Sequence, residues 1–354
     1  MNVKIILSLT ASIIKLFILI SLFTSNSNAE EQNIKSYSDD KGIISLMYHR
    51  FNEDKYPSTN IQMDIFKQQI KIIRDLKHNF YDPKNLEKNF HITKIEKKIL
   101  ITIDDAFSSF YEVAWPYLKE EKIPFILFVS TEAVGGNGYM TWDQIKELEK
   151  ENTVYIGNHS HTHDYLVDLN NDDFIKDINT ASKIFIKNLG YNPIFFSYPF
   201  GEYTSFIKEY ISKNFKFSFG QHSGIIDINK DRYELPRFPI NEKYGDLNRF
   251  EFLINLYPLQ YKTLHPEDKY ITDNNPPKLF VEFFEEQKNI NNINCFSDEG
   301  DNWKKSNINI NKKKLNLKYR EKFNFRRGRV NCSLNDDGVW RWLGVQFSVK
   351  QQLN

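Results

Sequence analysis

The 354-residue sequence has little cysteine and almost no net charge. Its 47 lysines and arginines nearly balance 46 aspartates and glutamates, which leaves a formal charge of +1. Proteins that bind nucleic acid through its phosphates carry a basic surface, so this balance excludes a general electrostatic footprint for nucleic acid. The two cysteines, Cys295 and Cys332, have no CxxC neighbour and no nearby histidine, which argues against a thiolate metal site.

Long hydrophobic runs are absent except within the first 29 residues. Lys4 gives this segment a positive start, Lys15 interrupts its apolar run, and the small residues 27–29 have cleavage-site spacing. The pattern predicts a signal peptide over residues 1–29 and an exported protein, either periplasmic or secreted. An uncleaved membrane anchor is the alternative, since the run is long enough to span a bilayer.

Export makes the cysteines informative. An oxidising compartment favours a disulfide between Cys295 and Cys332, with two buried free thiols as the alternative. No cysteine follows the hydrophobic run, which disfavours a lipoprotein anchor.

After a polar segment at residues 30–41, short apolar runs alternate with helical patterns. The strand-like runs are "GIISLMYH", "KILITID", "IPFILFVS", "TVYIGNHS", "IFFSYPFG" and "FKFSFGQHSG". Amphipathic spacing between them, as in "MDIFKQQIKIIRDLK", predicts helices. This alternation predicts parallel βα units, in either a barrel or a doubly wound sheet.

In both folds, function collects at the carboxyl ends of the strands. The polar residues that end the predicted strands are His49, Asp104, Asp105, Ser130, His159, Tyr198 and His222. We therefore expect them to converge on one edge of the sheet.

The composition changes at "TDNNPPK", residues 272–278, which reads as a linker. Short strand-like runs follow, the last two separated by the turn signal "NDDG". We predict an α/β domain at residues 42–271 and a small β-rich domain at residues 272–354.

Histidines 159, 161 and 163 lie close together in the sequence, and Asp104 and Asp105 end another predicted strand. Two histidines and a carboxylate with an open position are a typical catalytic zinc site. One aspartate can bind the metal while its neighbour accepts a proton, and a cation favours the ionised form of both carboxylates.

The motifs "TIDD" (102–105), "HSHTH" (159–163) and "YPFG" (198–201), in this order, resemble the polysaccharide deacetylase family, the NodB-homology carbohydrate esterases of family 4. The runs "LMYHRF" and "MTWDQI" resemble a subgroup of that family. The resemblance covers residues 42 to 240. It implies a distorted (β/α) barrel, here with a C-terminal β domain, and metal-dependent removal of acetyl groups from glycans that contain N-acetylglucosamine.

By position, the resemblance makes Asp104 the catalytic base and makes Asp105, His159 and His163 the metal ligands. His161 falls between the ligand positions and is left out of the set. The implied cofactor is a divalent metal, Zn²⁺ first, with Co²⁺, Ni²⁺ and Mn²⁺ as alternatives.

Two features depart from the family pattern. Ala106 stands where the first motif usually has glycine, and "FFSYPFG" lacks the arginine that pairs with the base. Arg237 in "LPRFPI" is our candidate for that arginine, and a surface arginine is the alternative.

The motifs also do not identify the residue that acts as general acid, because the late histidine motif that supplies it in many relatives is missing. His222 is the first candidate, since a histidine can titrate near neutral pH. His265, near the predicted linker, is the second.

Substrate contacts are predicted for His49, for the aromatic ring of Trp142, and for Tyr198, near which a backbone N–H would bind the oxyanion. Trp340 and Trp342 in "VWRW" share a strand face and could stack on a sugar or pack at the domain seam.

The predicted function is N-deacetylation. The alternatives are an O-acetyl glycan esterase with the same site and a catalytically silent glycan-binding protein. An acetylated glycan is the expected partner, and no stable protein partner is predicted.

Overall fold

The computed structural model describes residues 37, 40–88, 97–300 and 302–351, which form one compact unit. The predicted signal peptide and most of the polar segment at 30–41 lie outside these residues. No helix within the described ranges has the length and apolar character that crossing a membrane requires.

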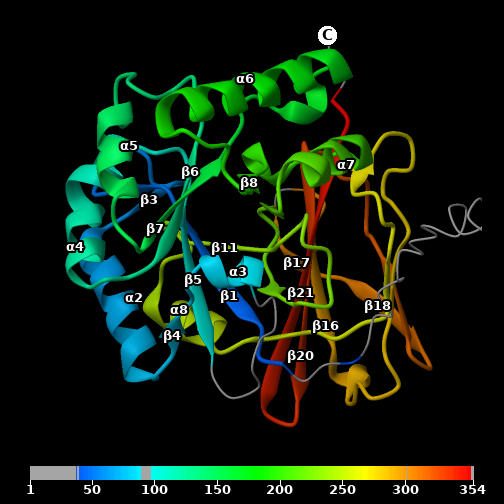
Figure 1. Cartoon of the computed structure of the whole chain (residues 1–354). Coiled ribbons are helices and arrows are strands. Elements are labelled where there is room, and N and C mark those ends of the chain that lie inside the picture. The colour runs from blue at the N-terminus through cyan, green and yellow to red at the C-terminus, as the bar shows by residue number, and fades with distance from the viewer. Residues whose placement is uncertain (1–36, 38–39, 89–96, 301, 352–354) are drawn as a thin grey trace, which may run out of the picture. The chain divides into compact units, whose positions relative to one another are not determined.

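A nine-stranded sheet forms the α/β part of the chain (Figure 1). Its strands are β1 (Ile43–Tyr48), β4 (Asn79–Phe80), β5 (Lys98–Ile103), β6 (Phe125–Val129), β7 (Val154–Asn158), β8 (Phe195–Ser197), β9 (Phe217–Phe219), β10 (Ile225–Ile226) and β11 (Phe238–Pro239). The main order is β10-β1-β5-β6-β7-β8-β9, with β11 on β1 and β4 on β5. Only the β1–β10 pairing is antiparallel among these described strands. Every residue of β1 and β6 is buried, as expected for a parallel sheet covered on both faces.

Residues 235–239 carry the chain back from the last strand of this sheet to the first. Leu235 bridges to Phe219 at the end of β9, and β11 then pairs with Leu46 and Met47 of β1. The sheet therefore curls into an incomplete barrel, and the predicted distorted (β/α) barrel with additional C-terminal strands is confirmed.

Seven helices are described between or after these strands: α2 (Met63–Asp75), α3 (Lys84–Lys88), α4 (Trp115–Glu120), α5 (Trp142–Glu149), α6 (Asn171–Leu189), α7 (Ser205–Asn214) and α8 (Leu247–Ile254). Apolar residues of α2, α4, α5 and α8 share one buried cluster with β1, β5 and β6. A second cluster packs α6 and α7 against β8. Local signals explain two of the ends: Thr141 and Gln144 form a capping box at the start of α5, and α6 stops at Gly190, whose φ is 85°.

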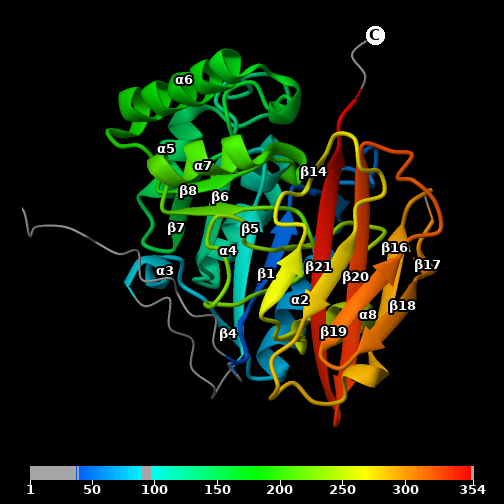
Figure 2. The same cartoon turned by 90° about the vertical axis from the view of Figure 1, so that its right-hand side faces the viewer.

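The C-terminal part contains two antiparallel-rich sheets, shown beside β1 in Figure 2. Their strands are β12 (Tyr257–Pro258), β13 (Thr263–His265), β14 (Tyr270–Ile271), β15 (Leu279–Glu282), β16 (Asn294–Asp298), β17 (Lys304–Lys305), β18 (Asn307–Asn311), β19 (Lys314–Lys318), β20 (Arg327–Asp336) and β21 (Val339–Val349). One sheet has the order β12-β21-β20-β16-β17 with β14 on β21, and the other has the order β13-β15-β19-β18. A separate two-stranded pair joins β2 (Arg50–Phe51) to β3 (Asn60–Ile61).

Strand pairing places the change of architecture before the predicted linker. Strands β12 and β14 pair with β21, and β13 pairs with β15, so these segments belong to the C-terminal sheets although they precede residue 272. The domain boundary at residue 272 stays a prediction. The predicted disulfide between Cys295 and Cys332 is confirmed, and it joins directly opposite residues of β16 and β20.

Candidate active site

The two aspartates of "TIDD" emerge from the carboxyl end of β5. Asp104 continues the ladder, since its N–H donates to the Tyr48 carbonyl at 2.9 Å, and its side chain is completely buried. Asp105 and Ala106 then take left-handed backbone angles, with φ of 72° and 54°. This sharp turn sends the two carboxylates to different partners.

The Asp104 carboxylate binds Arg237 through two hydrogen bonds. Arg237 Nη1 donates to Oδ1 at 2.6 Å and Nη2 donates to Oδ2 at 2.9 Å. The other guanidinium hydrogens go to Ser197 Oγ, Thr102 Oγ1 and the Gly220 carbonyl. All five N–H donors of this buried arginine are therefore used, which holds its plane in one orientation.

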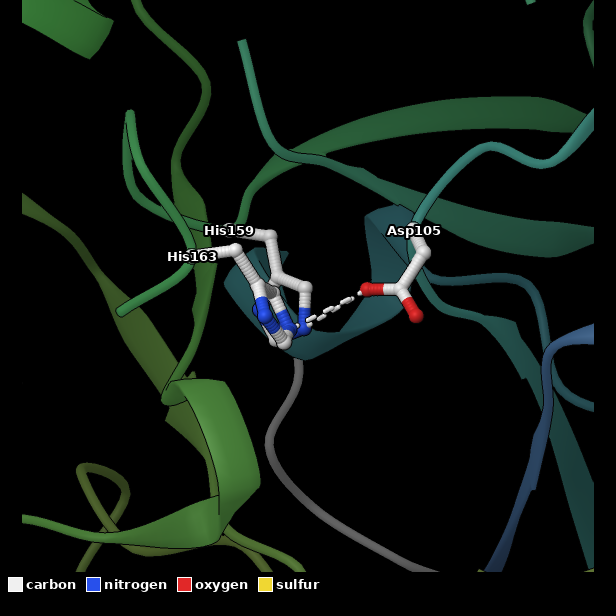
Figure 3. A group of neighbouring side chains, drawn as sticks. All are labelled: Asp105, His159 and His163. Carbon is white, nitrogen blue, oxygen red and sulfur yellow. Dashed lines mark ion pairs between the residues drawn. The ribbon is translucent and has the colours of Figure 1, made fainter. Parts of the chain in front are cut away.

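Asp105, His159 and His163 form a second group beside this pair (Figure 3). Asp105 Oδ1 lies 3.5 Å from His159 Nε2 and 3.2 Å from His163 Nε2. The three ligand atoms lie within 4.8 Å of one another. The group is thus a possible site for a metal ion.

Two observations test whether these residues fit a metal ion. Asp105 Oδ1 and His159 Nε2 are buried and have no hydrogen-bond partner among the described residues. His159 Nδ1 lies 2.7 Å from the Ser197 carbonyl, to which it must donate, so Nε2 carries a free lone pair. The site therefore offers two imidazoles and one carboxylate, the donor set of a catalytic zinc site.

The surroundings of Asp104, Asp105 and His159 favour two ionised carboxylates and a neutral imidazole, the charge states that a metal site of this kind needs. Burial would raise the Asp104 pKa, but Arg237 outweighs burial and holds that pKa below its usual value. The pKa of Asp105 is also lowered, because the interaction with His163 outweighs burial. Burial lowers the His159 pKa to about 4, so this imidazole is neutral at pH 7 and can act as a ligand.

Comparison with known proteins agrees with the resemblance found in the sequence motifs. Residues 91–216 match the family model described as polysaccharide deacetylase. This part of the chain therefore carries a polysaccharide deacetylase domain. The domain makes the protein a hydrolase of carbon–nitrogen bonds other than peptide bonds.

Named relatives of this deacetylase come from several bacteria. A poly-beta-1,6-N-acetyl-D-glucosamine N-deacetylase of Staphylococcus aureus is 25% identical over 258 residues, which are 64% of this chain and 87% of that protein. The structure of IcaB from Ammonifex degensii has a TM-score of 0.53 at 26% identity, covering 60% of this chain and 97% of that one. Deacetylase PplD of Streptococcus pyogenes has a TM-score of 0.53 at 24% identity, covers 58% of this chain and 95% of that one, and shares the fold.

His49 lies at the rim of the deacetylase site. It directly follows β1, and its Nε2 is 4.0 Å from Asp104 Oδ2, with 14% of the side chain exposed. The structure thus brings His49, Asp104 and the potential metal ligand His159 together, since His159 Nε2 is 3.8 Å from the same oxygen.

Tyr198 and Trp142 are not brought to the deacetylase site. The Tyr198 ring is fully buried, its hydroxyl donates to the Tyr233 carbonyl, and its N–H donates to the Phe219 carbonyl. Neither its ring nor its own N–H is thus free to meet a substrate. Trp142 is partly buried and packs at right angles to Phe185, 5.7 Å between ring centres, against the core.

His222 faces a different environment from the one predicted for a general acid. Its nearest charged groups include Glu234, Lys269 and Arg237, and burial lowers its pKa to about 4. It lines cavities at the junction with β21 rather than the group around Asp105. His265 stacks on Phe280 in the C-terminal sheets, and His161 contacts Thr131 instead of the metal group.

Asp177 of α6 is a positioning residue that the sequence did not reveal. Its buried carboxylate accepts hydrogen bonds from the N–H groups of His161 and Thr162 and from the Thr162 hydroxyl, at 2.8 to 2.9 Å. These bonds hold the loop between His159 and His163. A lone aspartate within a polar helical pattern has no sequence signal that separates it from its exposed neighbours.

Proposed function

We propose that this deacetylase removes N-acetyl groups from a glycan that contains N-acetylglucosamine. One observation carries the proposal: an ionised, buried carboxylate, Asp104 paired with Arg237, lies beside three potential metal ligands. The name of the Staphylococcus aureus relatives supports N-acetylglucosamine as the substrate sugar.

Asp105, His159 and His163 would hold a divalent cation. Zn²⁺ suits a site with two imidazoles and one carboxylate, and Co²⁺, Ni²⁺ and Mn²⁺ are the alternatives. Bound there, the cation would polarise the acetyl carbonyl and lower the pKa of water.

Asp104 would accept the proton of the attacking water. Its low pKa keeps it ionised at neutral pH, and the fork of Arg237 fixes the direction of both oxygens. Arg237 acts through Asp104 and is a positioning residue. A fixed base needs no reorganisation when the proton moves, which is the general advantage of a preorganised site.

The departing amine needs a proton donor. His49 is better placed for this role than His222, because His49 Nε2 is 4.0 Å from Asp104 Oδ2 whereas His222 faces Glu234 and Lys269. We therefore assign the general acid to His49, in place of the residue that the sequence favoured.

An O-acetyl ester would meet the same groups, so O-deacetylation is the second candidate. We also propose that the chain is exported. The pattern of residues 1–29 and the Cys295–Cys332 disulfide, which suits an oxidising compartment, support export.

An assay of two substrates tests the function. Amine release from N-acetylglucosamine oligosaccharides and acetate release from an acetate ester are measured with the purified protein, with chelator, and after Zn²⁺ is restored. We expect amine release that stops with chelator and returns with Zn²⁺. Ester cleavage alone would favour the O-acetyl candidate, and no turnover with added Zn²⁺ or Co²⁺ would overturn both.

The variant Asp104→Asn separates the base from the metal ligands. It should lose turnover while calorimetry still shows metal binding. Asp143→Asn, whose side chain is 97% exposed, is the matched control and should keep both properties.

A further inference from the structure

A groove lies where the barrel meets the C-terminal strands. It encloses a volume of about 180 Å³. We call it the seam groove. Its walls include Tyr244, Arg249, Trp303, Arg329, Asn331 and Trp342. Four of the six belong to the C-terminal part, which therefore builds one wall of the groove: Arg329 and Asn331 of β20, Trp342 of β21, and Trp303, just before β17.

The seam groove borders the active site on two sides. Pro239 lines it and pairs with Met47, two residues before His49. Gln221 lines it too, and its backbone touches Gly201, where a Cβ would come within 2.5 Å of the Gln221 nitrogen. The neighbouring Phe200 ring lies 4.8 Å from that of His163. The groove therefore lies next to segments that carry the residues around the two aspartates.

The groove offers the groups that bind a neutral sugar. Trp303 is 38% exposed and presents a flat ring, with the Arg329 guanidinium 5.4 Å from its centre. The Trp342 indole N–H is buried and has no acceptor among the described residues. Aromatic walls with a few directed polar groups are the usual composition of a small-molecule site, and here Arg329 and Asn331 supply polar groups beside the exposed Trp303 ring.

The charged side chains that line the groove are the arginines Arg249 and Arg329, and no aspartate or glutamate is among its lining residues. Arg329 is paired with Asp298, but no carboxylate of the described residues forms an ion pair with Arg249. Arg249 instead donates to the Tyr244 carbonyl and keeps its positive charge next to the groove. A deacetylated sugar carries an ammonium group, which this charge repels.

We propose that the seam groove is a subsite for an acetylated sugar of the same glycan chain, next to the sugar that is deacetylated. The inference rests on the proposed function and names a part of the substrate beyond the scissile group. Through Trp303, Asn331 and Arg329, the C-terminal β part sets the preference for chain length. Through Arg249, the groove discriminates against neighbours that have already lost their acetyl group.

Trp303→Ala tests the subsite, with Trp340→Ala as the matched control. Both tryptophans are 38% exposed, and Trp340 lines a separate cavity with Phe252 and Tyr257. For Trp303→Ala we expect kcat/KM on a hexasaccharide to fall about 10-fold, with a loss that shrinks as the oligosaccharide shortens to a disaccharide. A loss independent of length, or the same loss in Trp340→Ala, would overturn the proposal.

Binding keeps this test separate from that of the proposed function. Calorimetry with the Asp104→Asn protein and the fully acetylated hexasaccharide should show about 10-fold weaker binding when Trp303→Ala is added. Equal affinity with and without Trp303→Ala would refute the subsite even if turnover is observed. If the wild-type protein has no deacetylase activity but this difference is found, the groove stands and the proposed function fails.

Arg249→Gln tests the charge preference. The wild-type protein should prefer fully acetylated over half-deacetylated hexasaccharide, and the variant should lose about 3-fold of that preference at low salt. An unchanged ratio would show that Arg249 does not discriminate.

Discussion

At the scale of single residues, the pairing of Asp104 with Arg237 is the most constrained contact of the site. Both side chains are completely buried. Removing one member of such a pair leaves an uncompensated charge in the interior, which is why buried pairs are sensitive to substitution even when they add little net stability. The geometry of the fork matters as much as the charge, because only a guanidinium meets both carboxylate oxygens at once.

Arg237→Lys separates charge from geometry. Lysine keeps the positive charge but cannot span both Asp104 oxygens and also reach Ser197 and Gly220. We expect kcat to fall about 100-fold, because Asp104, the proposed base, is no longer held in place. Steady-state kinetics measure the effect, and the pH profile should shift because the pKa of Asp104 rises. Arg232→Lys, on the exposed surface of the same segment, is the control; an equal loss there would contradict a specific role.

The residue scale also shows what the sequence could predict. The resemblance to the deacetylase motifs pointed to Asp105, His159 and His163, and these three potential metal ligands lie together in the structure. The departure at Ala106 has a physical reading only in the structure, where φ is 54°, a region that favours glycine. Arg237 could be only a candidate, since its contact with Asp104 spans 133 residues and depends on how the barrel closes.

At the scale of elements, the loop after β7 depends on α6. Ser160 and His163 have left-handed backbone angles, with φ of 69° and 59°, so the loop needs outside support to keep His163 beside His159. Asp177 supplies three hydrogen bonds to it.

Asp177→Ala should loosen this loop. We expect metal affinity to fall about 10-fold, as is common when a residue behind a ligand is removed. Calorimetric titration with Zn²⁺ measures it. Asp172→Ala, an exposed residue in the first turn of the same helix, should leave the affinity unchanged. Equal affinities of the two variants would mean that α6 has no role in holding the ligands.

The disulfide belongs to the element scale as well, because it ties β16 to β20. Cys295 and Cys332 are separated by 37 residues, and closing a loop of this length restricts the unfolded chain by about 3–4 kcal/mol in the chain-entropy view. The double variant Cys295→Ala/Cys332→Ala should therefore have a lower free energy of unfolding, by about 2–4 kcal/mol, in urea titrations. Its effect on deacetylation of a disaccharide should be small, and a large one would indicate that β16 and β20 shape the catalytic centre itself.

Elements were predicted with uneven success for physical reasons. Long apolar runs such as β1 and β6 are visible in the sequence because both of their faces are buried. The hairpin of β20 and β21 was also visible, since "NDDG" supplies the residues with positive φ, Asp337 and Gly338. Strands of two or three residues, such as β12 and β13, have no periodicity to detect and are formed by pairing with distant strands.

At the scale of the whole molecule, the barrel and the C-terminal strands are joined close to the active site. Gln346 of β21 donates to the carbonyls of Phe200 and Gly201, in the loop that packs on His163. At Gly344 a Cβ would lie 1.9 Å from the Ser223 carbonyl, so β21 approaches as closely as a glycine permits. The sequence marked a seam, but it could not show that the seam reaches the catalytic edge, because that depends on strand register across the junction.

An ionisable group sits within this junction. Glu202 follows the 199–201 loop, is 1% exposed, and has no hydrogen-bond partner for either carboxylate oxygen among the described residues. Arg326 and Arg327 of the C-terminal part lie 3.7 and 3.8 Å from these oxygens. Burial raises the Glu202 pKa to about 7, and the two arginines only partly oppose the effect.

The pH dependence of stability follows from this shift. Between the ordinary glutamate pKa of about 4.3 and the native value of about 7, the folded chain binds a proton that the unfolded chain has lost, so this group's stabilising contribution decreases as pH rises through the window. Glu202→Gln removes the titration. Relative to wild type, the variant should show little change near pH 4 and a gain that grows to at most about 4 kcal/mol above pH 7. Unfolding in urea from pH 4 to pH 8.5 measures the difference.

Glu209→Gln, on the exposed face of α7, is the control. The difference between this variant and wild type in the free energy of unfolding should not grow over the upper part of this pH range. If Glu202→Gln is instead less stable than wild type above pH 7, Glu202 is ionised in the folded protein, and its attraction to Arg326 and Arg327 outweighs its burial.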